Sequence, residues 1–278
     1  MIQTFAGLSL DIPQVMGIVN ATPDSFSDGG KYLGAEAAIT HGRRLVAEGA
    51  SIIDIGGEST RPGAAPVSAD EEIARTVPVI RALAGEGIRV SIDTRHAAVM
   101  EAAVAAGAAI INDISALEGE GALSVAARSG ASVVLMHMRG QPADMQADPH
   151  YEDAPREIYE YLADRIDACL DAGIPLERIC VDPGIGFGKT TLHNLQLLAA
   201  LGSLQALGVP VLLGVSRKSF IGVLSRKEPA ERRLGGSLAA ALAGLDRGVK
   251  ILRVHDVAET AQAVAVWHAI DSVSSKRT

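Results

Sequence analysis

The sequence contains few aromatic residues and little positive charge, and these two shortages limit what it can bind. Only 3 % of its 278 residues are aromatic, so it offers few platforms on which the bases of single-stranded nucleic acid could stack. Its net charge of −8 is opposite to that of proteins that bind phosphate backbones. We therefore expect no nucleic-acid partner. Any anionic ligand must be held by a few local cations, helix N-termini or a metal.

Cysteine and long apolar runs are also scarce. Cys169 and Cys180 lie in no CxxC motif or Cys/His cluster, which argues against structural zinc and favours two reduced, buried thiols. The N-terminus has no basic region followed by an apolar one, so we expect no signal peptide. No stretch reaches the ~18 uninterrupted apolar residues of a membrane span, so we expect a cytoplasmic protein without membrane contact.

Eight short apolar runs recur along the chain, and each ends at a polar residue or a glycine that precedes polar residues. Continuous runs of this kind are typical of parallel strands that are buried on both faces. They span residues 15–19, 51–55, 89–92, 109–111, 132–136, 179–181, 211–215 and 251–254. Segments with a helical period lie between several of them, at residues 35–49, 72–84, 96–106, 156–171, 192–207 and 234–247.

This alternation predicts an α/β fold. One strand–helix unit recurs about every 34 residues, close to the length of a βα unit. Eight such units in one chain favour a single-domain (β/α)8 TIM barrel over residues 15–275, with a doubly wound open sheet as the structural alternative. Residues 1–14 precede the first strand, and we expect them to form a short N-terminal hairpin or a lid over the bottom of the barrel.

The active site of such a barrel lies at the carboxyl ends of its strands, where this sequence places polar groups. Asp93, Asn112 and Asp182 are short donors and acceptors at three strand ends. They suit an acid–base pair, or recognition of a flat heterocycle rich in N–H groups, and they could also cap the following helices. The residue types alone leave these three interpretations open.

A second group at the strand ends is cationic. Arg61, Lys218, Arg253 and His255, together with Asn20, could surround a di- or polyanion. The segment "PGIGFGKT" is not a Walker A loop, because a proline occupies the first glycine position. "GESTR" and "GVSRK" lack the closing glycine of a nucleophile elbow. A Mg²⁺ ion held by one oxygen ligand and by ligand phosphates is compatible with this set.

Eight longer motifs occur in a defined order along the chain. They are "MGIVNATPDSFSDGG", "DIGGESTRPGA", "SIDT", "INDI", "MHMRG", "DPGIGFGK", "GVSRKSFIG" and "LRVHDV". With them the sequence resembles the bacterial dihydropteroate synthase family from about residue 14 to residue 270. That family joins p-aminobenzoate to 7,8-dihydropterin-6-ylmethyl diphosphate and releases pyrophosphate in folate biosynthesis, and it is the target of sulfonamides.

The resemblance implies a role for each matching residue. Asp93, Asn112, Asp182 and Lys218 would bind the pterin ring, and Ile114, Met136, Phe187 and Gly214 would line its slot. Asn20, Arg61, Arg253 and His255 would hold the diphosphate, with Asn20 also touching Mg²⁺. Thr60, Pro62, Phe26 and Ser219 would form the p-aminobenzoate pocket. The family also implies a homodimer, and Asp93, Asp182 and Lys218 as catalytic residues.

The implied chemistry is dissociative and needs no protein nucleophile. Carboxylates would stabilise a pterin cation, cations would stabilise the departing diphosphate, and the loops would exclude water. A pterin-binding methyltransferase barrel and a non-catalytic pterin-binding protein are the alternative functions. The first has no use for a diphosphate grip, and the second would release no pyrophosphate.

Overall fold

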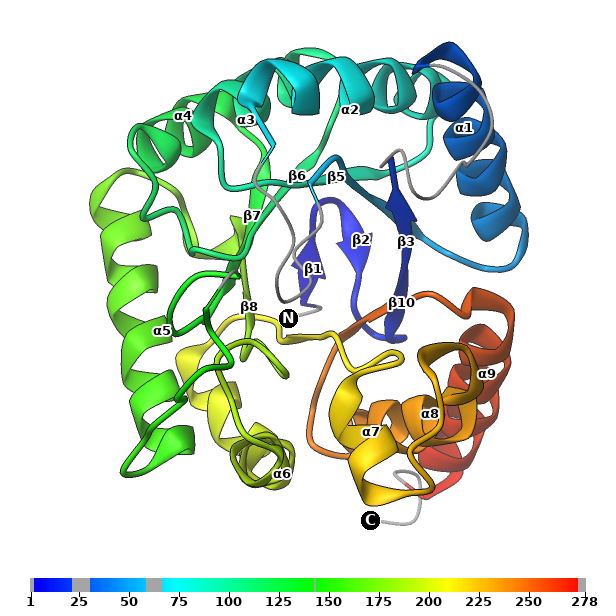
Figure 1. The fold of residues 1–278 in the computed structure, drawn as a ribbon, viewed down its shortest axis with the longest axis vertical. Coiled ribbons are helices and arrows are strands. Elements are labelled where there is room, and N and C mark those ends of the chain that lie inside the picture. Colours follow the sequence, from blue (N-terminus) through cyan, green and yellow to red (C-terminus); the bar gives the residue numbers. More distant parts are fainter. Residues whose placement is uncertain (1–2, 22–30, 59–66, 143, 275–278) are drawn as a thin grey trace.

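A ring of eight parallel strands surrounded by helices forms the centre of the molecule (Figure 1). The computed structural model describes residues 3–21, 31–58, 67–142 and 144–274. The strands are β3 (Gln14–Asn20), β4 (Ile52–Gly56), β5 (Val90–Asp93), β6 (Ile110–Asp113), β7 (Ser132–Met136), β8 (Ile179–Asp182), β9 (Leu212–Leu213) and β10 (Ile251–Val254). Each overlaps one of the eight apolar runs, because runs without polar interruptions suit strands buried on both faces.

The sheet closes into a barrel, which excludes the doubly wound alternative. Neighbouring strands follow the order β8-β7-β6-β5-β4-β3-β10-β9. A parallel bridge between Val181 and Val211 joins the two ends of this order. There the Val181 amide donates a hydrogen bond of 3.0 Å to the Pro210 carbonyl. The expected (β/α)8 fold is therefore confirmed.

Helices cover the outside of the ring (Figure 1). They are α1 (Lys31–Ala47), α2 (Ala69–Gly85), α3 (Ala97–Ala105), α4 (Ala122–Ser129), α5 (Ala154–Asp171), α6 (Thr191–Ala200), α7 (Ser219–Leu224), α8 (Leu234–Leu245) and α9 (Val257–Ser274). Short 3₁₀ turns occupy Leu176–Arg178, Leu201–Leu207 and Ala230–Arg232. None of the helices in the described ranges has both the length and the apolar character needed to cross a bilayer.

The helix predictions were wrong in two respects. The segment 192–207 is not one helix, because α6 changes into a 3₁₀ turn at Leu201, next to the helix-weakening Gly202. Helices α4, α7 and α9 were not predicted. α4 and α7 have only 8 and 6 residues, too few to show a period. α9 carries apolar side chains on its exposed face as well, which hides its period.

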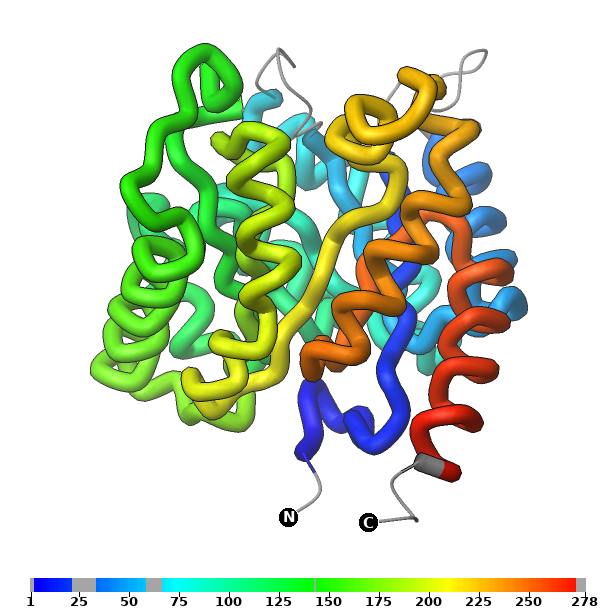
Figure 2. Tube along the Cα trace, turned by 90° about the horizontal axis from the view of Figure 1, so that it is seen from below, coloured from blue at the N-terminus to red at the C-terminus, as the bar shows by residue number. Residues whose placement is uncertain are grey.

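Side chains alternate between two environments along each strand. In β4, Ile53 and Ile55 pack outward against the helices, whereas Ile52 belongs to a cluster inside the barrel. The N-terminal hairpin β1 (Thr4–Phe5) and β2 (Leu8–Ser9) contributes Phe5 and Leu10 to that inner cluster. Figure 2 shows this blue hairpin at one end of the barrel and α7 at the other. The apolar inner cluster closes the bottom, so the polar interior positions lie toward the opposite end.

Candidate functional site

A narrow pocket lies inside the barrel at the carboxyl ends of the strands. Its lining residues are Asp93, Asn112, Ile114, Met136, Asp182, Ile185, Phe187, Gly214, Lys218 and Arg253. The free space between them is about 20 Å³, enough for about one water molecule. The structure thus brings together eight residues assigned to the pterin slot and one assigned to the diphosphate.

Asp93 and Arg253 form the charged floor of this pocket. The Arg253 Nη2 atom lies 2.5 Å from Asp93 Oδ2, and its Nε atom lies 2.6 Å from Asp54 Oδ2. Burial raises the pKa of Asp93 to about 7; Arg253 lowers it and Asp54 raises it further. Burial also lowers the pKa of Arg253, but the two carboxylates outweigh burial and raise it. Asp54 was missed, because it is in the middle of an apolar run and not at its end.

Asp182 is oriented by the glycine-rich loop that follows β8. One of its carboxylate oxygens, Oδ1, accepts a hydrogen bond of 2.7 Å from the Gly184 amide. Burial raises the pKa of Asp182, and this hydrogen bond partly opposes the effect. Gly184 has a φ of +67°, and a Cβ atom added there would lie 1.9 Å from the His137 carbonyl oxygen. Only glycine allows the loop to approach the end of β7 this closely.

Lys218 and Phe187 close the pocket from one side. The Lys218 ammonium lies 4.2 Å from the centre of the Phe187 ring, which is a cation–π contact. Burial lowers the pKa of Lys218 to about 8, although Asp182 favours its charged form. The preceding residue, Arg217, has a left-handed φ of 60°, and its guanidinium binds the Asp256 carboxylate at 2.5 and 3.1 Å. This ion pair connects the segment that carries Lys218 with the end of β10.

A buried lysine that the sequence analysis did not select connects two walls of the pocket. Lys189 is 3 % exposed and donates to the backbone carbonyls of Phe187 at 2.9 Å and His137 at 3.2 Å. Its Nζ atom also lies 2.9 Å from His137 Nδ1. Burial lowers the pKa of Lys189 well below its usual value. Within "PGIGFGKT" only Phe187 was assigned to the site, so the structural role of Lys189 was missed, as was the lining residue Ile185.

The remaining predicted residues are placed as follows. Asn20 ends β3 and pairs in register with Gly56, which in turn pairs with Asp93. His255 does not line the pocket; its Nδ1 atom lies 3.0 Å from Ser216 Oγ, and burial lowers its pKa to about 4. Ser219 is the exposed first residue of α7. Phe26, Thr60, Arg61 and Pro62 lie outside the described residues.

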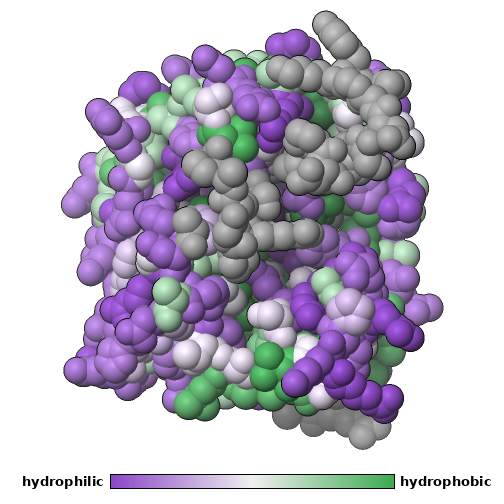
Figure 3. Space-filling view, viewed as in Figure 1, coloured by the Kyte–Doolittle hydropathy of each residue, from purple (hydrophilic) through white to green (hydrophobic). Residues whose placement is uncertain are grey.

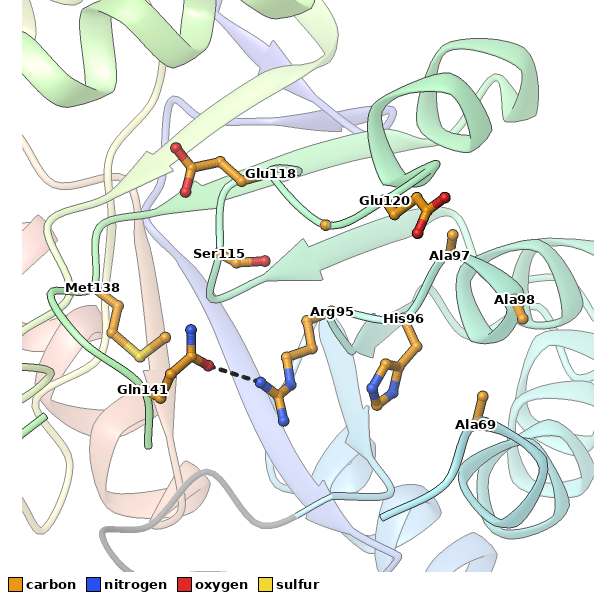
Figure 4. Close-up of a pocket in the computed structure, with 11 residues that line it drawn as sticks. Ala69, Arg95, His96, Ala97, Ala98, Ser115, Glu118, Glu120, Met138 and Gln141 are labelled. Carbon is orange, nitrogen blue, oxygen red and sulfur yellow. Dashed lines mark hydrogen bonds between the residues drawn. The ribbon is translucent and has the colours of Figure 1, made fainter. Parts of the chain in front are cut away.

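A wider pocket of about 630 Å³ is lined by residues that follow β5, β6 and β7, among them Arg95, Ser115 and Met138 (Figure 4). Arg95 points across it toward Gln141, with a hydrogen bond of 3.0 Å, and also pairs with Glu58 at 3.2 Å. Met138 lines this wider pocket and packs against the apolar wall of the narrow one. Among the residues that the structure describes, none of the predicted site residues lines this wider pocket.

The outer surface around the site is mainly hydrophilic. In Figure 3 apolar residues gather at the lower edge of this face, over α6, where Leu192 and Leu195 are exposed. Within the described ranges no group of three or more histidines, cysteines and carboxylates could hold a metal ion. A resident ion with only protein ligands is thus not supported there, whereas one held through a bound phosphate needs fewer protein ligands.

Comparison with known proteins gives a consistent result. A family model described as "Pterin binding enzyme" matches residues 16–255. The dihydropteroate synthase of Neisseria meningitidis serogroup C is 51 % identical over 267 residues, covering 95 % of this chain and 94 % of that protein. The Escherichia coli K12 enzyme of the same name is 47 % identical over 274 residues, covering 98 % and 97 %.

Solved structures agree with these relatives. The Xanthomonas albilineans dihydropteroate synthase with 4-aminobenzoic acid has a TM-score of 0.90 and 53 % identity, covering 95 % of each chain. The Yersinia pestis enzyme in complex with a sulfonamide drug has a TM-score of 0.92 and 48 % identity, covering 98 % of this chain and all of the other. About half of the residues are thus shared over nearly the full length of the same barrel. The resemblance inferred from the eight motifs is confirmed: this chain belongs to the dihydropteroate synthase family of transferases, among the pterin-binding enzymes.

Proposed function

We propose that the narrow pocket binds a dihydropterin ring, and that the enzyme joins its 6-ylmethyl carbon to the amine of p-aminobenzoate with release of pyrophosphate. The observation that supports this most strongly is the convergence of Asp93, Asn112, Asp182 and Lys218 on one buried pocket. The Xanthomonas albilineans relative has been solved with 4-aminobenzoic acid and with 7,8-dihydropteroate, which supports the same substrate classes here.

The pterin ring carries amino and ring N–H groups, and carboxylates can accept hydrogen bonds from them. Asp93 and Asp182 are 8 % and 6 % exposed, so their hydrogen bonds to a ring would be little weakened by water. The free space in the slot, about 20 Å³, is too small for a ring, and the Lys218 ammonium lies 4.2 Å from the centre of the Phe187 ring. We therefore propose that pterin entry moves the Lys218 ammonium away from the Phe187 ring. In its new position the ammonium donates a hydrogen bond to the pterin.

The reaction follows a dissociative path in this proposal. Loss of diphosphate leaves a delocalised pterin cation, which the Asp93 and Asp182 carboxylates stabilise more than the neutral ring. Arg253 and Arg61 stabilise the departing anion by their charge, and His255, whose pKa burial lowers to about 4, contributes a neutral N–H donor. No protein nucleophile is needed. The amine of p-aminobenzoate attacks the cation and loses a proton, and because the pterin lies deeper, p-aminobenzoate binds second.

A Mg²⁺ ion bound to the diphosphate of the substrate is compatible with this proposal. The Asn20 amide oxygen is a hard ligand at the carboxyl end of β3, and the substrate's phosphate oxygens would complete the coordination. When bound, Mg²⁺ would offset the negative charge of the leaving diphosphate. Asn20 would orient the diphosphate toward the mouth of the barrel.

The second pocket and the oligomeric state follow from the resemblance. We propose that Ser219, together with Phe26, Thr60 and Pro62, contributes to the p-aminobenzoate pocket. We also propose a homodimer. α9 exposes Val266, Ile270 and Val273 by 57 %, 64 % and 57 %, at a spacing that puts them on one helix face. The division into an extension of residues 1–14 and a barrel of residues 15–275 remains a prediction.

Pyrophosphate release tests the proposed function directly. We expect release from the pterin diphosphate to depend on p-aminobenzoate, with equimolar dihydropteroate as the other product. A methyltransferase or a binding protein would give no such release. In calorimetry, Phe26→Ala should weaken p-aminobenzoate capture more than pterin binding. The reverse result would remove Phe26 from the second pocket.

A further inference from the structure

A buried carboxylate lies directly beneath the pocket and belongs to none of the groups assigned above. Asp54 is 0 % exposed in the middle of β4. Its Oδ2 atom accepts hydrogen bonds from Arg253 Nε at 2.6 Å and from Asn112 Nδ2 at 3.2 Å. One oxygen thus orients two residues that line the pocket.

Arg253 is divided between two carboxylates. Its Nε atom faces Asp54, and its Nη2 atom faces Asp93 Oδ2 at 2.5 Å. When both carboxylates are ionised, two buried negative charges share one positive charge, which leaves one net negative charge beneath the ring. Such an arrangement lowers the stability of the fold, because each buried carboxylate loses its hydration. Stability by itself therefore does not explain why both carboxylates are present.

The second oxygen of Asp54 supports a role beyond packing. Within the described part of the chain, Asp54 Oδ1 and Ser91 Oγ are buried atoms without a hydrogen-bond partner. These two residues pair in register on neighbouring strands. A carboxylate that only anchored Arg253 would gain by using both oxygens. Here the anchoring uses one, and the excess negative charge remains inside the barrel.

We propose that Asp54 is a positioning residue that shares the Arg253 guanidinium with Asp93 and thereby sets the negative charge that Asp93 presents to the pterin. This inference rests on the proposed function of the site. Asp54 itself touches no substrate; it acts through Arg253 and Asn112.

The electrostatic consequences can be worked out from the groups around Asp93. Arg253 and Lys218 favour the ionised form of Asp93, whereas Asp54, Glu72 and Asp113 disfavour it. Burial and these neighbours raise the pKa of Asp93 to about 7. If Asp54 were neutral, Arg253 would pair with Asp93 alone, and Asp93 would ionise at lower pH. The floor would also lose its net negative charge and stabilise the pterin cation less.

The variant Asp54→Asn tests this with little change in shape. Its amide oxygen can still accept from Arg253 and Asn112, but it carries no charge. The matched control is Ser91→Ala, which removes a polar atom without a partner at the paired position. Pyrophosphate release is measured against pH for the intact enzyme with both substrates, to obtain kcat and kcat/KM.

We expect Asp54→Asn to lower the plateau of kcat by about 10- to 100-fold and to move the acid limb down by about one pH unit. Ser91→Ala should leave the acid limb in place. A purely structural role would lower activity without moving the limb, and that result would overturn the proposal. So would a wild-type profile that has no acid limb near neutral pH.

Thermal unfolding of both variants shows whether each variant is folded. If Asp54→Asn does not fold, Asp54→Ser takes its place, with room for a water beside Arg253, and the same shift is expected. Failure of both to fold would assign Asp54 to barrel stability and refute the proposal. The wild-type dependence on p-aminobenzoate is scored separately, so the proposed function can stand even if Asp54 proves to be structural.

Discussion

Replacing Gly184 by alanine is the sharpest test of how the pocket is built. Gly184 has a φ of +67°, and an added Cβ would lie 1.9 Å from the His137 carbonyl oxygen. The backbone of the loop must therefore retreat from the end of β7. That movement withdraws the Gly184 amide from Asp182 Oδ1, now 2.7 Å away.

Two contributions determine the expected loss of stability, and a third determines the expected loss of pterin affinity. The left-handed conformation costs an alanine about 1–2 kcal/mol. Relief of the close contact by backbone movement costs about 1–3 kcal/mol more. We therefore expect the free energy of unfolding to fall by about 2–5 kcal/mol. Loss of a hydrogen bond to a charged carboxylate, about 1.5–3 kcal/mol, should weaken pterin binding roughly 10- to 100-fold.

Gly130→Ala is the matched control. Gly130 has a similar φ of +73°, but an added Cβ there would meet nothing within 4 Å. Denaturant unfolding of both variants separates the conformational cost from the contact cost. Calorimetry with a pterin then reports on the site. If Gly184→Ala lost no more stability than Gly130→Ala and bound pterin normally, the proposed role of the close approach would be wrong.

Three further predictions concern other parts of the molecule. Asp93→Asn should fold and lose about 100-fold or more in turnover, since it removes a fixed charge from the site; near-normal rates would exclude Asp93 from the mechanism. Burial, and to a smaller extent Lys189, lower the pKa of His137 to about 2. The ordinary histidine pKa is about 6.5, so between pH 6.5 and pH 2 His137 is protonated in the unfolded chain but not in the folded one. Wild-type stability should therefore fall by about 2 kcal/mol more than that of His137→Asn between pH 7 and pH 5, and equal losses in denaturant unfolding at the two pH values would contradict this. Phe5→Ala, at a side chain 1 % exposed in the bottom cluster, should cost about 3–5 kcal/mol in unfolding without changing the pterin KM, and a changed KM would show coupling between the two ends of the barrel.

The sequence was informative wherever a property is local. Apolar runs such as 132–136 match their strands because burial on both faces requires uninterrupted apolar residues. Polar residues at the ends of these runs, such as Asp93 and Asp182, then had to meet at one end of a parallel barrel. The family motifs added the expected roles, which the geometry alone does not assign.

Relations between distant segments were decided only by the tertiary structure. Arg253 reaches Asp54 across 199 residues and Asp93 across 160, and Lys189 meets His137 across 52. In the sequence, Asp54 is only a polar residue within an apolar run. The tertiary structure shows that its side chain lies inside the barrel beside Arg253. Periodicity along one chain determines which face a side chain occupies. Which charges share that interior, and hence how strongly each is ionised, depends on strand register and barrel closure, and no single stretch of sequence contains that information.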